Sequence, residues 1–103
     1  MATGSFGDLI AGPMPVLVDF FATWCGPCKA LAPQLEVFAR EHDGRVKVLK
    51  IDVDQNPQLA GALQVQGVPT LILFQDGQPV WRQSGALSSA QLAQQLNPFL
   101  SQG

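Results

Sequence analysis

Two cysteines, Cys25 and Cys28, stand one helical turn apart directly after an apolar segment, and the chain contains no others. Residues i and i+3 share one face of a helix, so these side chains can form a disulfide with little backbone movement. Such a short ring stabilises a fold by only about 2 kcal/mol through loop entropy, against ~3 kcal/mol for a 15-residue ring. The pair therefore indicates thiol chemistry better than a structural cross-link.

The two cysteines occupy different places in the predicted helix. Cys25 lies at the first turn, where unpaired backbone N–H groups and the helix dipole favour a thiolate. Cys28 lies further inside the helix, where its amide is already engaged. We therefore expect Cys25 to be the exposed thiol that attacks a disulfide, and Cys28 to be the buried thiol that resolves the mixed disulfide.

Asp19 is the anomaly in the apolar run 16–22. Burial of a carboxylate raises its pKa, and a raised pKa suits a proton relay near neutral pH. Lys50, on the next predicted strand, should limit that rise. The alternative is that Asp19 is an ordinary hydrogen-bonded residue at the end of its strand.

Metal binding is the main alternative for the cysteine pair. Structural zinc takes four ligands, and Cys25, Cys28 and His42 are the only Cys and His residues of the chain. A metal or iron–sulfur cluster shared between two chains would supply the missing ligands. We expect no metal, and we expect His42 to be a solvated residue in the last turn of its helix.

The composition excludes other classes of protein. A chain of 103 residues with 47% hydrophobic content fits one domain, 1–103, with a single core. Six Lys and Arg against eight Asp and Glu leave no basic stripe for nucleic acid. The apolar run 13–22 is too short to span a membrane, and the first residues lack the basic segment of a signal peptide. We expect a cytoplasmic protein, with an organelle stroma as the alternative.

The hydrophobic pattern predicts an α/β fold in which strands and helices alternate. A strand, a helix and a second strand in succession predict a parallel pair with a right-handed crossover. The predicted strands are 16–22, 46–53, 70–74 and 79–84, and the predicted helices are 5–11, 25–42, 56–63 and one from Ser88 to about Asn97. Ser5 is the N-cap expected for the first helix, and Asp76-Gly77 predicts a hairpin turn.

The motif Trp24-Cys25-Gly26-Pro27-Cys28-Lys29 follows a strand, and Val68-Pro69-Thr70 comes about forty residues later. Together they resemble the thioredoxin family, over residues 16–100. The resemblance implies a thioredoxin fold, with three layers, α/β/α, and a central mixed sheet. It also implies a redox-active disulfide, Cys25–Cys28, as the only redox group, and a relay of Asp19 and Lys50. Finally, it implies a cis-proline and a substrate surface of Trp24, Gly26, Pro27, Gly67, Val68, Pro69, Gly85 and Ala86.

The first residues depart from the family pattern. Thioredoxins begin with a strand before the first helix, and only four residues precede Ser5 here, too few for a typical strand. We predict that this strand is absent or vestigial, which leaves four strands in the order second, first, third, fourth. Segment 46–53 then lies at a sheet edge, where the charge of Lys47 opposes pairing with the edge of another chain. We expect a monomer, with a dimer paired through this edge as the alternative.

The resemblance implies a thiol–disulfide oxidoreductase that reduces protein disulfides and contributes to electron transport and redox homeostasis. Gly26-Pro27 resembles the reducing members, because oxidases and isomerases usually carry a histidine between the cysteines. Nothing in the sequence resembles a flavin or nicotinamide site, so a thioredoxin reductase, linked to NADPH or ferredoxin, must supply electrons. The alternative is a binding module that docks on a partner enzyme without redox turnover.

Overall fold

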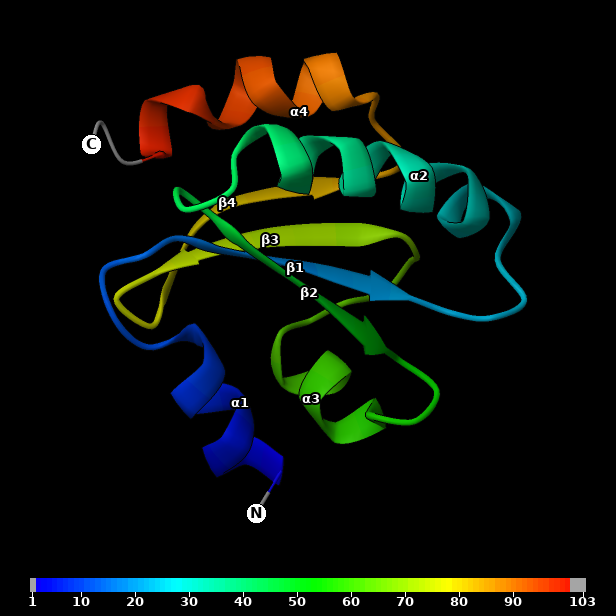
Figure 1. The fold of residues 1–103 in the computed structure, drawn as a ribbon. Helices are drawn as coiled ribbons and strands as arrows, with labels where there is room; N and C mark the ends of the chain where they lie inside the picture. The colour runs from blue at the N-terminus through cyan, green and yellow to red at the C-terminus, as the bar shows by residue number, and fades with distance from the viewer. Residues whose placement is uncertain (1, 101–103) are drawn as a thin grey trace.

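The computed structural model describes residues 2–100. Within that range, helices and strands alternate along the chain as the hydrophobic pattern predicts (Figure 1). The elements are α1 (Ala2–Ile10), β1 (Val16–Phe21), α2 (Gly26–Glu41), β2 (Lys47–Asp52), α3 (Pro57–Ala62), β3 (Thr70–Gln75), β4 (Gln78–Ser84), α4 (Ser89–Leu96) and the 3₁₀ turn Asn97–Phe99. No helix in this range is long and apolar enough to cross a lipid bilayer.

The strands of residues 2–100 form one mixed sheet in the order β2-β1-β3-β4. β1 pairs in parallel with β2, and β3 pairs antiparallel with both β1 and β4. The parallel register places Asp19 opposite Lys50. This order confirms the predicted one, and it leaves β2 at one edge of the sheet in the part of the chain that is described.

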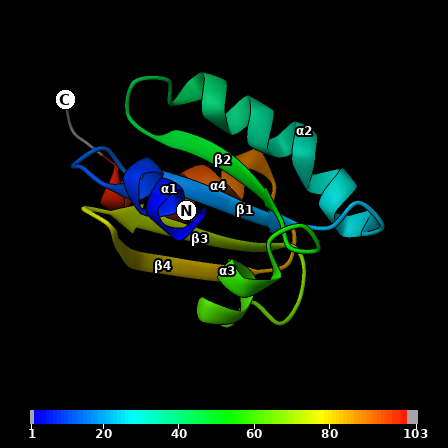
Figure 2. The same cartoon turned by 90° about the horizontal axis from the view of Figure 1, so that it is seen from below.

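Helices cover both faces of the sheet, as Figures 1 and 2 show. Alternate residues of a strand point to opposite faces, so Leu17 and Val18 of β1 belong to two separate core clusters. The cluster of Leu17 includes Leu31 of α2 and Leu92 of α4, whereas the cluster of Val18 includes Phe6 of α1. Three layers follow, with α2 and α4 on one face and α1 and α3 on the other.

Local signals in the sequence account for several turns and helix ends. Asp76 and Gly77 both adopt positive φ, 52° and 79°, as the type I′ turn of an Asp-Gly hairpin requires. Ser88 and Gln91 form a reciprocal capping box at the start of α4. Asn56 occupies the N-cap of α3, but its side chain donates to the backbone oxygen of Asp52 instead of capping the helix.

Two sequence predictions about the helix ends are wrong. The first helix begins at Ala2, so Ser5 lies inside α1 and is not its N-cap. His42 is only 5% exposed, not solvated. Its ring stacks on Phe38, one turn earlier, at 4.3 Å between centroids, and its Nδ1 lies 2.9 Å from the carbonyl oxygen of Phe38. The stacked ring of Phe38 shields the imidazole from water.

Candidate active site

Cys25 is the N-cap residue of α2. Its backbone is extended, with φ −91° and ψ 113°, and its Sγ accepts a hydrogen bond from the backbone N–H of Cys28 at 3.1 Å. Pro27 lies in the first turn, where the missing N–H costs the helix nothing. Cys25 and Cys28 form a disulfide, with their Cα atoms 5.3 Å apart. The amide that would otherwise have no partner at this helix end therefore points at the sulfur of Cys25.

The sequence predicted an exposed Cys25 and a buried Cys28, and this prediction is wrong, because both residues are buried. The exposed fractions of the two residues are 4% and 5%. Ala22 is buried with the pair, and Phe21 and Val68 pack against it. The asymmetry between the two sulfurs therefore comes from their places in the helix, because exposure does not distinguish them.

Asp19 is fully buried in the middle of β1. Neither carboxylate oxygen has a hydrogen-bond partner among residues 2–100, so the reading as an ordinary bonded residue at a strand end is wrong. Burial raises the pKa of the Asp19 carboxyl to about 6, and the positive charge of Lys50 limits the rise. Strand alternation places Asp19 on the face of Leu17, which is covered by α2, the helix that carries Cys28.

Lys50 faces Asp19 across the parallel strand pair. Its Nζ lies 4.9 Å from the ring centroid of Phe21, which also packs against the cysteine pair. The ammonium group thus lies above an aromatic ring close to the buried acid, a contact that stabilises a cation.

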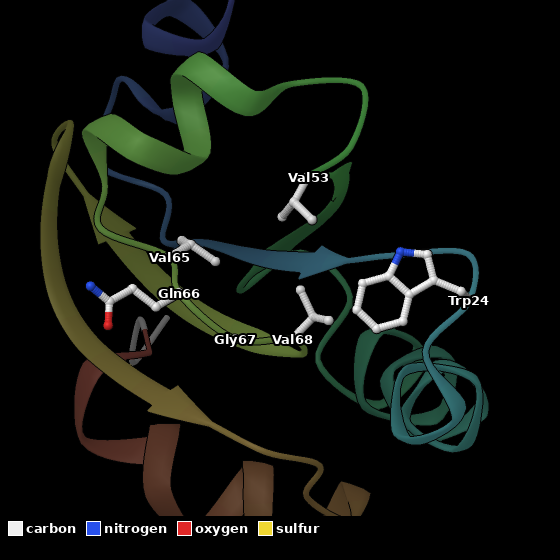
Figure 3. Close-up of a pocket in the computed structure, with 6 residues that line it drawn as sticks. All are labelled: Trp24, Val53, Val65, Gln66, Gly67 and Val68. Carbon is white, nitrogen blue, oxygen red and sulfur yellow. The ribbon is translucent and has the colours of Figure 1, made fainter.

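A hollow opens with Trp24 on one side and the segment 65–68 across from it (Figure 3). Two of its lining residues, Val53 and Val68, also pack against the cysteine pair. Its lining residues are Trp24, Val53, Val65, Gln66, Gly67 and Val68. Trp24 is 69% exposed, as its position at the strand-to-helix turn predicts. An exposed indole beside an apolar hollow provides a flat contact surface for another chain.

The segment before β3 brings a backbone carbonyl to the sulfur of Cys25. The carbonyl oxygen of Val68 lies 3.7 Å from Sγ of Cys25, and the Val68–Pro69 peptide bond is cis. The hydroxyl of Thr70 donates to the carbonyl of Gly67 at 2.6 Å. These contacts place Gly67, Val68 and Pro69 beside the cysteine pair.

Gly85 joins the same end of the sheet. Its N–H donates to the carbonyl oxygen of Pro69 at 2.9 Å, and its φ of +97° is one that side chains rarely adopt. Ala86 follows in the exposed loop, and Gly26 and Pro27 are exposed at the start of α2. Gly85 is thus bonded to the segment 67–69, which contacts Cys25 through Val68, and Gly26 and Pro27 lie between the two cysteines.

Two residues of this region were missed by the sequence reasoning. Asp54 accepts a hydrogen bond from Nε1 of Trp24 at 2.8 Å. Arg82 binds the backbone carbonyls of Leu63 and Gln64, at the end of α3. The exposed indole N–H of Trp24 needs a hydrogen-bond acceptor, but the sequence does not identify Asp54 as that acceptor. No local pattern links Arg82 to Leu63 and Gln64, which lie 19 and 18 positions away in sequence.

The donors needed for a metal do not converge in the part of the chain that is described. Among residues 2–100, no three His, Cys, Asp or Glu side chains form a group that could hold one ion. His42, the third candidate ligand, caps the opposite end of α2 from the N-cap residue Cys25.

Comparison with known proteins agrees with this geometry. The family model for thioredoxin matches residues 1–98. The chain belongs to the thioredoxin family. A thioredoxin-like protein of Synechocystis sp. is 50% identical to it over 97 residues, which cover 93% of this chain and 92% of that protein. A thioredoxin of Mycobacterium bovis is 53% identical over 90 residues, 87% of this chain and 78% of that protein.

The likeness extends to structure. A mutant thioredoxin from Halobacterium salinarum superposes with a TM-score of 0.87 at 39% identity, covering 97% of this chain and 87% of that one. Thioredoxins are thiol–disulfide oxidoreductases, and this chain carries its Cys25–Cys28 pair at disulfide distance. The protein is a thiol–disulfide oxidoreductase of the protein-disulfide reductase type.

Proposed function

We propose that Cys25 is the attacking thiol and Cys28 the resolving thiol of this reductase. The observation that carries the assignment is the N-cap position of Cys25, whose sulfur accepts the N–H of Cys28 at 3.1 Å. A hydrogen bond to sulfur, together with the helix dipole, favours the thiolate. Only a thiolate attacks a disulfide, and only Cys25 of the pair has this environment.

The reaction transfers two electrons to the target in two displacement steps. The Cys25 thiolate forms a bond to one target sulfur, the target S–S bond breaks, and one target thiolate leaves. Cys28, as its thiolate, then attacks the Cys25 sulfur. The Cys25–Cys28 disulfide forms and the second target thiolate is released, so the target disulfide is reduced as the dithiol is oxidised.

Asp19 is the proposed proton acceptor for Cys28, and Lys50 its electrostatic partner. A carboxyl with a pKa of about 6 is ionised at neutral pH, yet basic enough to take a proton from a thiol. Its unpaired oxygens lie on the face of the sheet that α2 covers. Exchange of this proton lets Cys28 become a thiolate when it resolves the mixed disulfide.

The target binds, in this proposal, across the exposed surface around the cysteines. Trp24 and the apolar hollow would contact side chains of the target, and the backbone of Val68 lies beside the reacting sulfur. The flanking residues are Gly26, Pro27, Gly67, Pro69, Gly85 and Ala86. An extended target segment suits this surface, since glycine and alanine allow close approach of a second backbone.

The electrons come from a thioredoxin reductase, and the Cys25–Cys28 disulfide is the redox group, with no further cofactor. A bifunctional thioredoxin reductase/thioredoxin of Mycobacterium leprae supports this partner: it is 52% identical over 92 residues, 89% of this chain and 20% of that protein. We place the protein in the cytoplasm, where thiols rest in the reduced state. We expect a monomer in sedimentation experiments, and a dimer would point to pairing through the β2 edge.

Two serine variants test the roles of the cysteines. Cys28→Ser should accumulate a mixed disulfide between Cys25 and a model target such as insulin, because the resolving thiol is missing. Cys25→Ser should neither reduce insulin nor form the adduct. Turnover by Cys25→Ser, or equal trapping by both variants, would contradict the assignment and favour a binding module.

A further inference from the structure

The C-terminal end of α3 is held by a side chain from a distant strand. Arg82 of β4 donates from Nη1 to the carbonyl oxygen of Leu63 and from Nη2 to that of Gln64, each at 2.6 Å. The contact spans 18 to 19 positions in sequence. It joins an exposed strand to a helix end, and the proposed thiol chemistry makes no use of it.

Gln64 has a backbone conformation that side chains rarely adopt. Its φ is +57°. Its N–H donates to the carbonyl of Gly61, and the N–H of Val65 donates to that of Ala60, which is the bond pair of a Schellman motif. Glycine usually occupies the left-handed position of this motif, because a Cβ crowds the following carbonyl. Support from outside the helix can therefore stabilise the turn at Gln64.

The guanidinium of Arg82 provides that support. The last carbonyls of a helix have no partner within the helix and carry partial negative charge. A guanidinium presents its donors as a planar fork, so one side chain can bind two neighbouring carbonyl oxygens. Such charge-assisted bonds are stronger than neutral ones. Arg82 thus fixes the turn that begins the next segment.

That next segment is one wall of the hollow beside the disulfide. Val65, Gln66, Gly67 and Val68 line it, across from Trp24 (Figure 3). Thr70 and Gly85 tether the downstream part of this wall, through hydrogen bonds to Gly67 and Pro69. Arg82 tethers its upstream end at Gln64.

We infer that Arg82 is a positioning residue for target binding. By holding Gln64, it keeps the 65–68 wall at the distance from Trp24 that a target segment requires. It touches no reacting atom, so the displacement chemistry should not depend on it. The inference rests on the proposed binding of targets across the hollow.

The test compares a protein disulfide with a small one. Arg82→Met should raise the KM for insulin about fivefold and change kcat less than about twofold, because binding and not chemistry is affected. The rate with a small aromatic disulfide, which does not fill the hollow, should stay within about twofold. The insulin KM of Arg82→Lys should lie between those of the wild type and Arg82→Met, since the point charge of a lysine cannot bind both carbonyl oxygens as a fork. Arg40→Met, the same change in the last turn of α2, is the matched control.

A second-site change tests the route of the effect. Gln64→Gly introduces the residue that the left-handed turn prefers. The insulin KM of Arg82→Met/Gln64→Gly should therefore return most of the way to the wild-type value. Amide hydrogen exchange of residues 65–68 should rise in Arg82→Met and fall again in the double variant. If Arg82→Met does not fold, Arg82→Lys and its pair with Gln64→Gly carry the same comparison.

An unchanged insulin KM in a folded Arg82→Met protein would overturn the inference, as would an equal loss with the small disulfide or no recovery with Gln64→Gly. Trp24→Ala separates this failure from that of the proposed binding surface. If Trp24→Ala raises the insulin KM and Arg82→Met does not, only the role of Arg82 is wrong. If neither variant changes it, the binding surface is wrong as well.

Discussion

The two sides of the site are held in different ways. At the start of α2, the contacts are local: Cys28 donates to Cys25, and a disulfide joins the same two residues, three positions apart. Across the hollow, the segment 64–69 is held from far along the chain, by Arg82 at Gln64 and by Gly85 at Pro69. The two sulfurs of the proposed chemistry thus lie in one short segment, whereas the proposed recognition surface depends on contacts between distant segments.

This difference predicts two kinds of failure. Damage to the start of α2 should remove electron transfer to every disulfide, large or small. Damage to the opposite segment should weaken reduction of protein disulfides alone, because a small disulfide needs only the sulfur. The predictions below use this contrast, from the largest effect to the smallest.

Cys25→Ser gives the largest effect. Reduction of both insulin and a small aromatic disulfide should fall to the uncatalysed background, since Cys28 lacks the N-cap environment that we propose activates Cys25. A turbidity assay for insulin and an absorbance assay for the small disulfide measure the two rates. Retention of either activity would show that the chemistry is not confined to the start of α2.

Asp19→Asn should stabilise the protein at neutral pH. The pKa of Asp19 rises from its ordinary value of 3.8 to about 6 in the fold, so the folded state binds its proton more tightly. Its contribution to stability is present below pH 4 and is lost as the pH rises through 6. By linkage the loss amounts to about 3 kcal/mol above pH 7, and the asparagine variant should avoid it.

Urea unfolding of oxidised wild type and Asp19→Asn at pH 4 and pH 8 measures this effect. The stability difference should be large at pH 8 and small at pH 4, while Asp8→Asn, at an exposed carboxyl of α1, should show no such change. Asp19→Asn should also slow resolution of the mixed disulfide, because the proposed proton acceptor for Cys28 is gone. An identical pH dependence in the two proteins would contradict the buried-acid interpretation.

Thr70→Val disturbs the opposite side of the hollow. It removes the hydrogen bond to the carbonyl of Gly67 at nearly constant volume, which should cost about 1 kcal/mol of stability. We expect the insulin KM to rise roughly threefold with the small-disulfide rate unchanged, in line with about 0.7 kcal/mol lost from binding. Ser84→Ala removes only the longer 3.4 Å contact to the same hydroxyl and should have less effect. Equal losses for both substrates would remove the contrast between the two sides.

Asp54→Ala should give the smallest change. It removes an exposed hydrogen bond of 2.8 Å to Trp24, and exposed bonds contribute little to stability. In a Trp81→Phe background, Trp24 fluorescence should shift and the insulin KM should rise by no more than about twofold. An unchanged spectrum would show that Asp54 does not orient the indole.

The sequence predicted the features that depend on neighbouring residues. The strand around Asp19, the helix after Cys25 and the helix that starts at Ser88 all follow from local patterns, and the structure contains each of them. Prediction from the sequence failed where side-chain packing decides how exposed a residue is. His42 is buried by the ring of Phe38, and Cys25 is as buried as Cys28 because Val68 approaches from another segment. The contacts of Arg82 and Asp54 are equally remote in sequence.

The most direct test is which cysteine of the reduced protein reacts first. Exposure does not separate them in the disulfide form, so a preference must come from the N-cap position of Cys25. Reduced protein is treated with less than one equivalent of iodoacetamide at pH 7, and its peptides are analysed by mass spectrometry. We predict modification almost entirely at Cys25. Equal modification of the two residues, or preference for Cys28, would contradict the assignment of Cys25 as the attacking thiol.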